Sequence, residues 1–133
     1  MSLSSYPIRA SIAVSDMAQS REFYEGKLGL RAREQQADNS RLYGCGGGTS
    51  LHVYASAATA GTSAATLATW QVTNLERVVD ELAANGVTFE IYGEPLKTGE
   101  NGVHTLAGGK VAWFKDPDGN TFAVEEQHAW RAS

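Results

Sequence analysis

Residues 14–17, Val-Ser-Asp-Met, and residues 72–75, Val-Thr-Asn-Leu, share one order: an apolar residue, a hydroxyl residue, an Asp or Asn, and a second apolar residue. Each stretch joins a segment of alternating apolar residues to one in which apolar residues recur at helical spacing. A residue able to cap a helix stands at each join, Ser15 or Asp16 in the first copy and Asn74 in the second. The two stretches begin 58 residues apart, at 14 and 72, in a chain of 133 residues. The sequence therefore predicts two similar modules, each opening with a strand and a helix.

The first copy belongs to an expected β-α-β-β-β module. Every second position of residues 8–14 is apolar, which predicts a half-buried strand. The helix that follows carries an apolar stripe that includes Phe23 and Tyr24, and Gly29 is a suitable stop. Three further strands are expected at residues 30–35, 41–45 and 49–54.

The second copy also predicts a strand, a helix and then further strands. A strand at 67–72 is followed by a helix with Leu75, Val78, Val79 and Leu82 on one face, which ends at Asn85-Gly86. Further strands are expected at residues 87–92, 103–106, 111–115 and 121–126.

The predicted fold class is α+β, a single domain over 1–133 with two tandem β-α-β-β-β modules at 7–55 and 67–127. Residues 56–66 contain only Ala, Ser, Thr and Gly and are interpreted as the linker. One module leaves an apolar face on a small sheet, so two modules must bury these faces together, and their curled mixed sheets are expected to enclose a groove. Exposed strand edges favour a homodimer.

Composition narrows the possible partners. With 11 basic and 15 acidic residues, the net charge of −4 gives no basic surface for nucleic acid or an anionic membrane. No stretch approaches the ~20 apolar residues that cross a bilayer. Cys45 is the only cysteine, so no intramolecular disulfide can form and a reducing, bacterial-type cytoplasm is expected. A small molecule is therefore the expected ligand.

Several short motifs together resemble the vicinal oxygen chelate superfamily, which includes glyoxalase I, extradiol dioxygenases and bleomycin-resistance proteins. They are residues 14–16, Phe23-Tyr24, Leu-Gly-Leu at 28–30, and Trp-Phe-Lys-Asp-Pro-Asp-Gly-Asn at 113–120. The resemblance implies the glyoxalase/bleomycin resistance fold and, in the enzymes, a divalent metal held in the groove by His, Gln or Glu side chains. Within the last motif, Asp116 and Asp118 are interpreted as turn-forming residues and not as catalytic ones.

The positions that correspond to the family's metal ligands, located by strand parity, are Arg9, His52, Leu67 and Ala123. Only His52 can coordinate a metal, because Arg9 is a permanent cation and the other two have no donor atom. No cofactor, metal ligand or catalytic residue is therefore expected. The alternative is a divalent metal at an unconventional site made of His52, His104 and Glu125.

Without a metal, the groove is expected to bind by shape, apolar contact and the charge of Arg9. An ion pair between Arg9 and Glu125 or another acid is the competing structural interpretation. The parity of the strand at 111–115 relative to the groove stays open. The candidate ligand-binding residues are Arg9, Ser11, His52, Tyr54, Thr69, Gln71, Tyr92, Trp113 and Glu125.

Three functions remain open at this point. The first is a binding protein for a hydrophobic or planar metabolite or antibiotic. The second is a lyase, isomerase or dioxygenase of the same superfamily that uses Arg9 and His52 or the unconventional metal site. The third, a domain that binds proteins through its sheet edges, has no feature in its favour.

Overall fold

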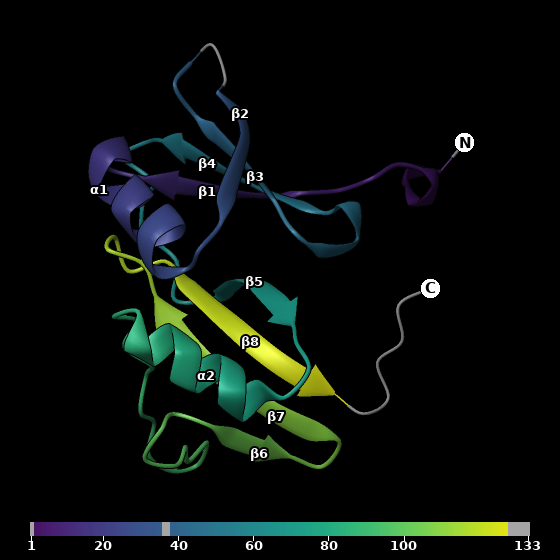
Figure 1. Ribbon diagram of the computed structural model, residues 1–133, viewed down its shortest axis with the longest axis vertical. Coiled ribbons are helices and arrows are strands. Elements are labelled where there is room, and N and C mark those ends of the chain that lie inside the picture. Colours follow the sequence, from purple (N-terminus) through teal and green to yellow (C-terminus); the bar gives the residue numbers. More distant parts are fainter. Residues whose placement is uncertain (1, 36–37, 128–133) are drawn as a thin grey trace.

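Two four-stranded mixed sheets form the framework of the chain in the computed structural model, which describes residues 2–35 and 38–127. Figure 1 shows the first sheet above the second. The first sheet has the order β1-β4-β3-β2 and the second has the equivalent order β5-β8-β7-β6. In each, the first and last strands of the module pair in parallel and the others pair antiparallel. The predicted α+β fold of two modules is confirmed.

The strands have the following bounds: β1 Ala10–Val14, β2 Arg31–Gln35, β3 Arg41–Gly44, β4 Ser50–Ala55, β5 Thr66–Gln71, β6 His104–Leu106, β7 Gly109–Lys115 and β8 Thr121–Gln127. Each module has one helical segment between its first two strands. In the first, α1 at Met17–Arg21 runs directly into a π-helical segment at Glu22–Lys27, and in the second α2 covers Leu75–Ala84. Short 3₁₀ turns occupy Leu3–Ser5 and Gly46–Gly48.

The first helix begins as the sequence predicts. The carboxylate of Asp16 accepts hydrogen bonds from the backbone amides of Ala18 and Gln19, at 2.9 and 3.2 Å. The prediction that Asn74 caps the second helix is wrong. Asn74 has a left-handed backbone, with φ of 53°, whereas a capping side chain reaches the helix amides from an extended backbone. Glu126 of β8 takes this place, because its carboxylate accepts a hydrogen bond from the Leu75 amide at 2.9 Å.

The predicted strand at 87–92 is also wrong, because only Phe89 forms a single bridge, to Phe114 of β7. β6 already occupies this edge of β7 at residues 109–111, so a short length of edge remains for another segment. From Tyr92 the chain turns away into a loop, in which Tyr92 and Thr98 exchange backbone and side-chain hydrogen bonds.

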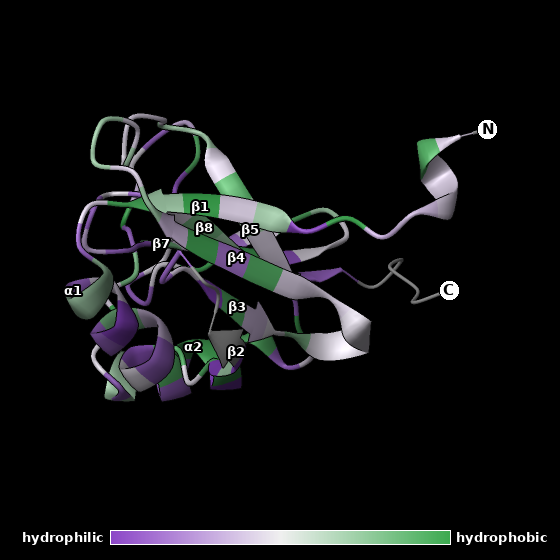
Figure 2. Cartoon of the chain, turned by 90° about the horizontal axis from the view of Figure 1, so that it is seen from above, coloured by the Kyte–Doolittle hydropathy of each residue, from purple (hydrophilic) through white to green (hydrophobic). Residues whose placement is uncertain are grey.

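A single hydrophobic core joins the two modules. Tyr24, which follows α1, is fully buried, and its ring stacks on Tyr43 of the first sheet and meets Phe122 of the second edge-on, each at 6.0 Å between centroids. Phe23 lies 6.2 Å from Phe114 in the second sheet. Figure 2 shows apolar and polar residues alternating along β1 and β4, so that each strand gives one face to this core.

The turn at 116–120, in the second module, forms hydrogen bonds with residues of the first module. Asp116 is buried, and its carboxylate accepts hydrogen bonds from the backbone amides of Asp118 and Asn120, which confirms its turn-forming role. The same carboxylate accepts the hydroxyl proton of Tyr24 at 2.6 Å. Asp118 in turn accepts hydrogen bonds from the amide and the hydroxyl of Ser15, at 3.0 and 2.5 Å. The motif that carries the family resemblance is thus an intermodule contact.

Candidate functional site

The face of the first sheet that points away from the core carries polar and aromatic side chains. In β4, the buried Leu51 and Val53 alternate with the half-buried His52 and Tyr54, and strand pairing sets Ser11 of β1 beside His52. Three candidate ligand-binding residues, Ser11, His52 and Tyr54, therefore lie on this face, which we call the first open face. Strand parity predicts this direction, away from the core.

The second sheet has an equivalent face, which we call the second open face. Strand pairing sets Ala123 between Thr69 and Trp113, and sets Glu125 beside Gln71. Because Phe114 is buried in the core, its neighbour Trp113 points to the second open face, which answers the parity question that the sequence left open.

Aromatic rings gather beside Trp113. The rings of Tyr92 and His104 lie 5.6 and 6.2 Å from the Trp113 ring, measured between centroids. Tyr92 also lines a hollow of about 520 Å³ between the linker and the end of β7, and none of the other candidate residues lines this hollow. Tyr92 and Trp113 thus form an aromatic cluster on the second module, whereas His52 and Tyr54 lie on the first.

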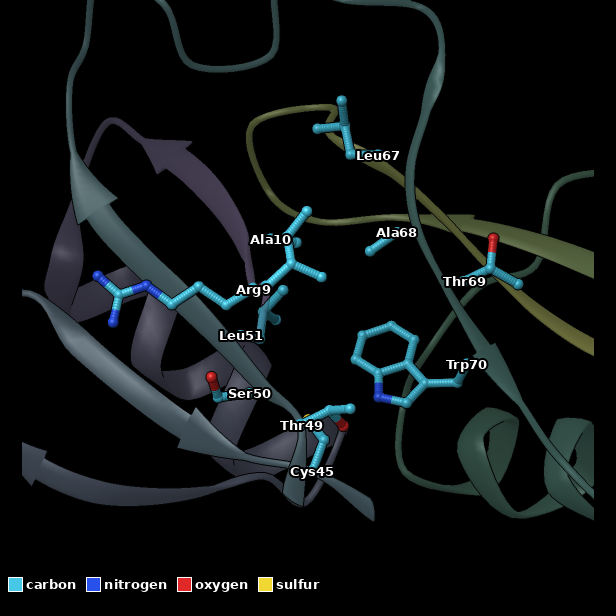
Figure 3. Close-up of a pocket in the computed structure, with 11 residues that line it drawn as sticks. Arg9, Ala10, Cys45, Thr49, Ser50, Leu51, Leu67, Ala68, Thr69 and Trp70 are labelled. Carbon is cyan, nitrogen blue, oxygen red and sulfur yellow. The ribbon is translucent and has the colours of Figure 1, made fainter. Parts of the chain in front are cut away.

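A cavity of about 440 Å³ opens where β1 and β4 begin and β5 runs past them. We call it the junction cavity. Figure 3 shows its lining side chains, which come from residues 8–10, 45, 49–51 and 67–70. Trp70 closes the side toward the second sheet and packs against Phe114 and Phe122 of the core, at 6.2 and 5.7 Å. The cavity therefore combines apolar walls with a polar rim.

Two of the nine candidate residues, Arg9 and Thr69, line the junction cavity. Cys45, Thr49 and Leu51 are not among the candidate residues, but they line the cavity from the turn before β4 and from the start of that strand. The glycines at 46–48 indicate a turn there, but strand parity says nothing of which side chains a turn directs inward.

Arg9 lies at the rim of the junction cavity, and Figure 3 shows its guanidinium pointing away from Trp70. No acidic side chain of residues 2–33 or 38–127 forms an ion pair with it. Glu125, its expected partner in the competing interpretation, instead accepts a hydrogen bond from Gln71 at 2.9 Å. The ion pair between Arg9 and Glu125 is therefore not formed, and the cation is available at the rim.

His52 is held by two neighbours. Its Nε2 lies 3.0 Å from the hydroxyl oxygen of Ser40, and its ring stacks on Tyr54 at 5.6 Å with 17° between the planes. Burial lowers the pKa of His52, the positive charge of Arg9 lowers it further, and Asp38 opposes the shift. Burial and the charge of Arg9 therefore favour the neutral form of the His52 imidazole.

The residues at the family's metal positions do not fit a metal. Arg9, Leu67 and Ala123 supply no donor atom, and His52 alone falls short of the three protein ligands that catalytic sites use. The unconventional trio is not assembled either, since no three His, Cys, Asp or Glu side chains within the described ranges come together as a metal site. His104 directs Nδ1 at the Lys97 carbonyl, 3.1 Å away, and Glu125 accepts from Gln71.

A second cavity lies on the core side of the second sheet. It has a volume of about 160 Å³ and only apolar lining residues, among them Leu28, Val78 and Phe114. We call it the apolar cavity. Trp70 lines both this cavity and the junction cavity.

None of the helices that the structure describes has the length and apolar character needed to cross a bilayer.

The comparisons with known proteins agree with this geometry. No curated protein matches the sequence. Among solved structures, the antibiotic-binding protein TnmS3 from Streptomyces sp. CB03234 has 20% identity and a TM-score of 0.70, over 92% of this chain and 95% of its own. UcmS2 has 19% identity and a TM-score of 0.71, over 90% and 96%. A glyoxalase / bleomycin resistance protein from Catenulispora acidiphila DSM 44928 has 22% identity and a TM-score of 0.65, over 90% and 96%.

At these identities the solved structures show a shared fold. The family model described as Glyoxalase/Bleomycin resistance protein/Dioxygenase superfamily matches residues 8–124, which include the junction cavity and both sheets except the last three residues of β8. The chain therefore belongs to the glyoxalase/bleomycin resistance protein/dioxygenase superfamily.

Proposed function

We propose that this protein binds a small, planar or hydrophobic molecule with a negatively charged group, a metabolite or an antibiotic, without a metal. The observation that carries the proposal is the junction cavity with Arg9 at its rim. Its volume of about 440 Å³ lies within the range of small-molecule sites, roughly 300–1,000 Å³. Trp70 and Leu51 offer apolar contact, and a guanidinium without an ion-pair partner in the described part of the chain can hold a carboxylate or phosphate.

The relatives of known structure support a binding role. TnmS3, which shares the fold over nearly its full length, is an antibiotic-binding protein. The donor set supports a site without metal, because one imidazole is the only potential ligand at the four family positions.

We further propose that the protein acts as a homodimer in a bacterial cytoplasm. The outer edges of β2 and β6 pair with no other strand of residues 2–35 and 38–127, and the two open faces present the half-buried side chains of His52, Tyr54 and Trp113. A second copy can cover them and extend the site, with Arg9, Ser11, His52 and Tyr54 on one wall and Thr69, Gln71, Tyr92, Trp113 and Glu125 on the other. The unpaired thiol of Cys45 suits a reducing compartment. Light scattering after size exclusion tests the dimer, and a monomeric mass at micromolar concentration contradicts it.

The second candidate is an enzyme of the superfamily, a lyase, isomerase or dioxygenase. The feature in its favour is the imidazole of His52, since burial and the charge of Arg9 lower its pKa and favour its neutral form. A neutral histidine can take a proton from a substrate, and a nearby cation can stabilise the anion that results.

Two measurements separate the candidates. Elemental analysis of the purified protein reports bound metal, and a thermal-shift screen covers planar antibiotics, catechols and thiol adducts of 2-oxo-aldehydes. Binding predicts a raised Tm with planar anionic compounds that EDTA does not change. A stoichiometric metal, or stabilisation that EDTA abolishes, supports the enzyme and contradicts the metal-free site.

A further inference from the structure

Three side chains at the first open face form a hydrogen-bonded chain. The hydroxyl of Ser40 lies 2.6 Å from a carboxylate oxygen of Asp38, and its oxygen lies 3.0 Å from Nε2 of His52. Ser40 is buried, with 2% of its surface exposed, so water has little access to this hydroxyl. The backbone amide of Ser40 also donates to Asp38, at 3.0 Å, which fixes the two residues relative to each other.

The proton positions in this chain follow from the chemistry of its members. A carboxylate only accepts hydrogen bonds, so the single proton of the Ser40 hydroxyl is directed at Asp38. The hydroxyl oxygen of Ser40 must then accept from His52, which requires the proton of the imidazole to be on Nε2. Nδ1 carries the lone pair and has no hydrogen-bond partner among the described residues.

We infer that Asp38 and Ser40 are positioning residues that hold His52 as its Nε2–H tautomer, so that Nδ1 is a fixed hydrogen-bond acceptor. His52 pairs with Ser11 of the neighbouring strand, and Arg9 precedes Ser11 by two residues. This inference rests on the proposed function and makes it more specific. The site selects molecules that offer a hydroxyl or N–H donor together with an anionic group, as hydroxyl-bearing aromatic acids do. Tyr54, stacked on the imidazole, keeps the ring plane in place.

The tautomer can be measured without a ligand, by ¹⁵N NMR of the full-length protein labelled at histidine. His52 is expected as the Nε2–H tautomer. His104 is an internal reference of opposite type, because its Nδ1 faces the Lys97 carbonyl, which can only accept. Observation of the Nδ1–H tautomer at His52 overturns the inference.

Two variants test the role of the chain. Asp38→Ala releases the Ser40 proton, which can then be donated to Nε2, so a mixture of tautomers is expected. Ser40→Ala removes the partner of Nε2 and is also expected to give a mixture. A His52 tautomer that is unchanged in both variants contradicts the positioning role.

Ligand selection is tested by titration calorimetry with benzoate and the three hydroxybenzoate isomers as probes. At least one isomer is expected to bind the wild-type protein about five- to tenfold more tightly than benzoate, as for one neutral hydrogen bond. Ser40→Ala should abolish this preference, and Arg77→Ala, an exposed control on α2, should keep it. Equal binding of all four probes, no binding of any, or a preference retained in Ser40→Ala overturns the ligand class. The result is different if the proposed function itself is wrong and the inference about the tautomer is right. In that case no compound of the wider screen binds, while the NMR spectrum still shows the Nε2–H tautomer.

Discussion

At the scale of single residues, Arg9 is the side chain whose loss should most affect an anionic ligand. Arg9→Ala is expected to weaken binding of such a ligand by about 1.5–3 kcal/mol, the range for hydrogen bonds to charged groups. Calorimetry with a hit from the thermal-shift screen measures the change. Arg77→Ala removes an equal charge from the exposed surface of α2 and should leave the affinity unchanged. Equal affinity of Arg9→Ala and the wild type would place the ligand elsewhere.

The charge of Arg9 should also be measurable without a ligand, through its effect on the pKa of His52. Burial and the charge of Arg9 both lower the pKa of His52, so the neutral form stabilises the fold above pH ~6.5 and this stability is lost as the pH falls below that value. Arg9→Ala is expected to raise the pKa of His52 toward the ordinary value, and Asp38→Asn to lower it further. An NMR titration of the histidine ring protons measures both shifts. An unchanged midpoint in Arg9→Ala would show that the guanidinium lies far from the imidazole.

Tyr24 offers a residue-scale test of the intermodule contact. Tyr24→Phe removes the proton that Asp116 accepts in a buried position, so the free energy of unfolding should fall by about 1.5–3 kcal/mol in urea. Tyr43→Phe is the matched control, with a smaller loss expected because its partner Glu25 is partly exposed. Equal losses would argue against a special role of the buried carboxylate.

The same tyrosine predicts a pH dependence. Burial, followed by the charge of Asp116, raises the pKa of Tyr24, while an unfolded tyrosine ionises near pH ~10. The free energy of unfolding should therefore decrease as the pH rises above ~10, and it should decrease less in Tyr24→Phe. Tyr43 contributes in the same direction, because burial and Glu25 raise its pKa.

Side-chain direction in the strands could be predicted from the sequence, because the period of two is a property of the extended backbone itself. This placed Ser11, His52 and Tyr54 on one face correctly. Ser40 could not be predicted in the same way, since its contact with His52 depends on how the turn before β3 closes. Loop residues have no periodicity from which a partner can be deduced.

At the scale of elements, the linker is held against the turn at 116–120. Gly61 donates its amide to Asn120 at 3.1 Å and has a φ of 66°. A Cβ at this position would collide with the Asp118 carbonyl oxygen, so Gly61→Ala should lower stability more than backbone strain alone explains. Gly47→Ala is the control, with a similar φ of 64° and open space around it, and should cost about 1–2 kcal/mol. Urea unfolding of both variants gives the difference, and equal losses would mean that the linker moves freely away from the turn.

Most elements were predictable because strand and helix periods are local. The two errors, at Asn74 and at residues 87–92, both arise from tertiary structure. Glu126 replaces the Asn74 side chain at the helix start, and β6 takes the edge of β7 on which 87–92 would pair. In each case a residue or strand distant in sequence competes successfully with the local preference.

At the scale of the whole molecule, the shared core predicts that the two modules unfold together. Tyr24 contacts both sheets, so neither module keeps an intact core when the other unfolds. Far-UV and near-UV circular dichroism should give the same urea midpoint at a fixed protein concentration. Two separate transitions, or a folded fragment of residues 67–127, would contradict a single cooperative unit.

The duplication made the whole fold predictable, since a repeat of 58 residues allows few arrangements. The junction cavity was not predictable at this scale. It is formed where the start of one sheet meets β5 of the other, and its shape depends on how Leu51, Leu67 and Trp70 pack across that boundary. Such packing leaves no pattern within either module.

Trp70 is a lining residue of both the junction cavity and the apolar cavity. A molecule that enters either cavity should change the polarity around the Trp70 indole. The fluorescence of Trp70 should therefore report binding in these cavities. Emission that shifts in the wild type and not in Trp70→Phe would assign the signal to this residue. A ligand with an apolar tail that displaces Trp70 should also disturb the packing of α2, because Val78 and Leu82 of this helix line the apolar cavity together with Trp70.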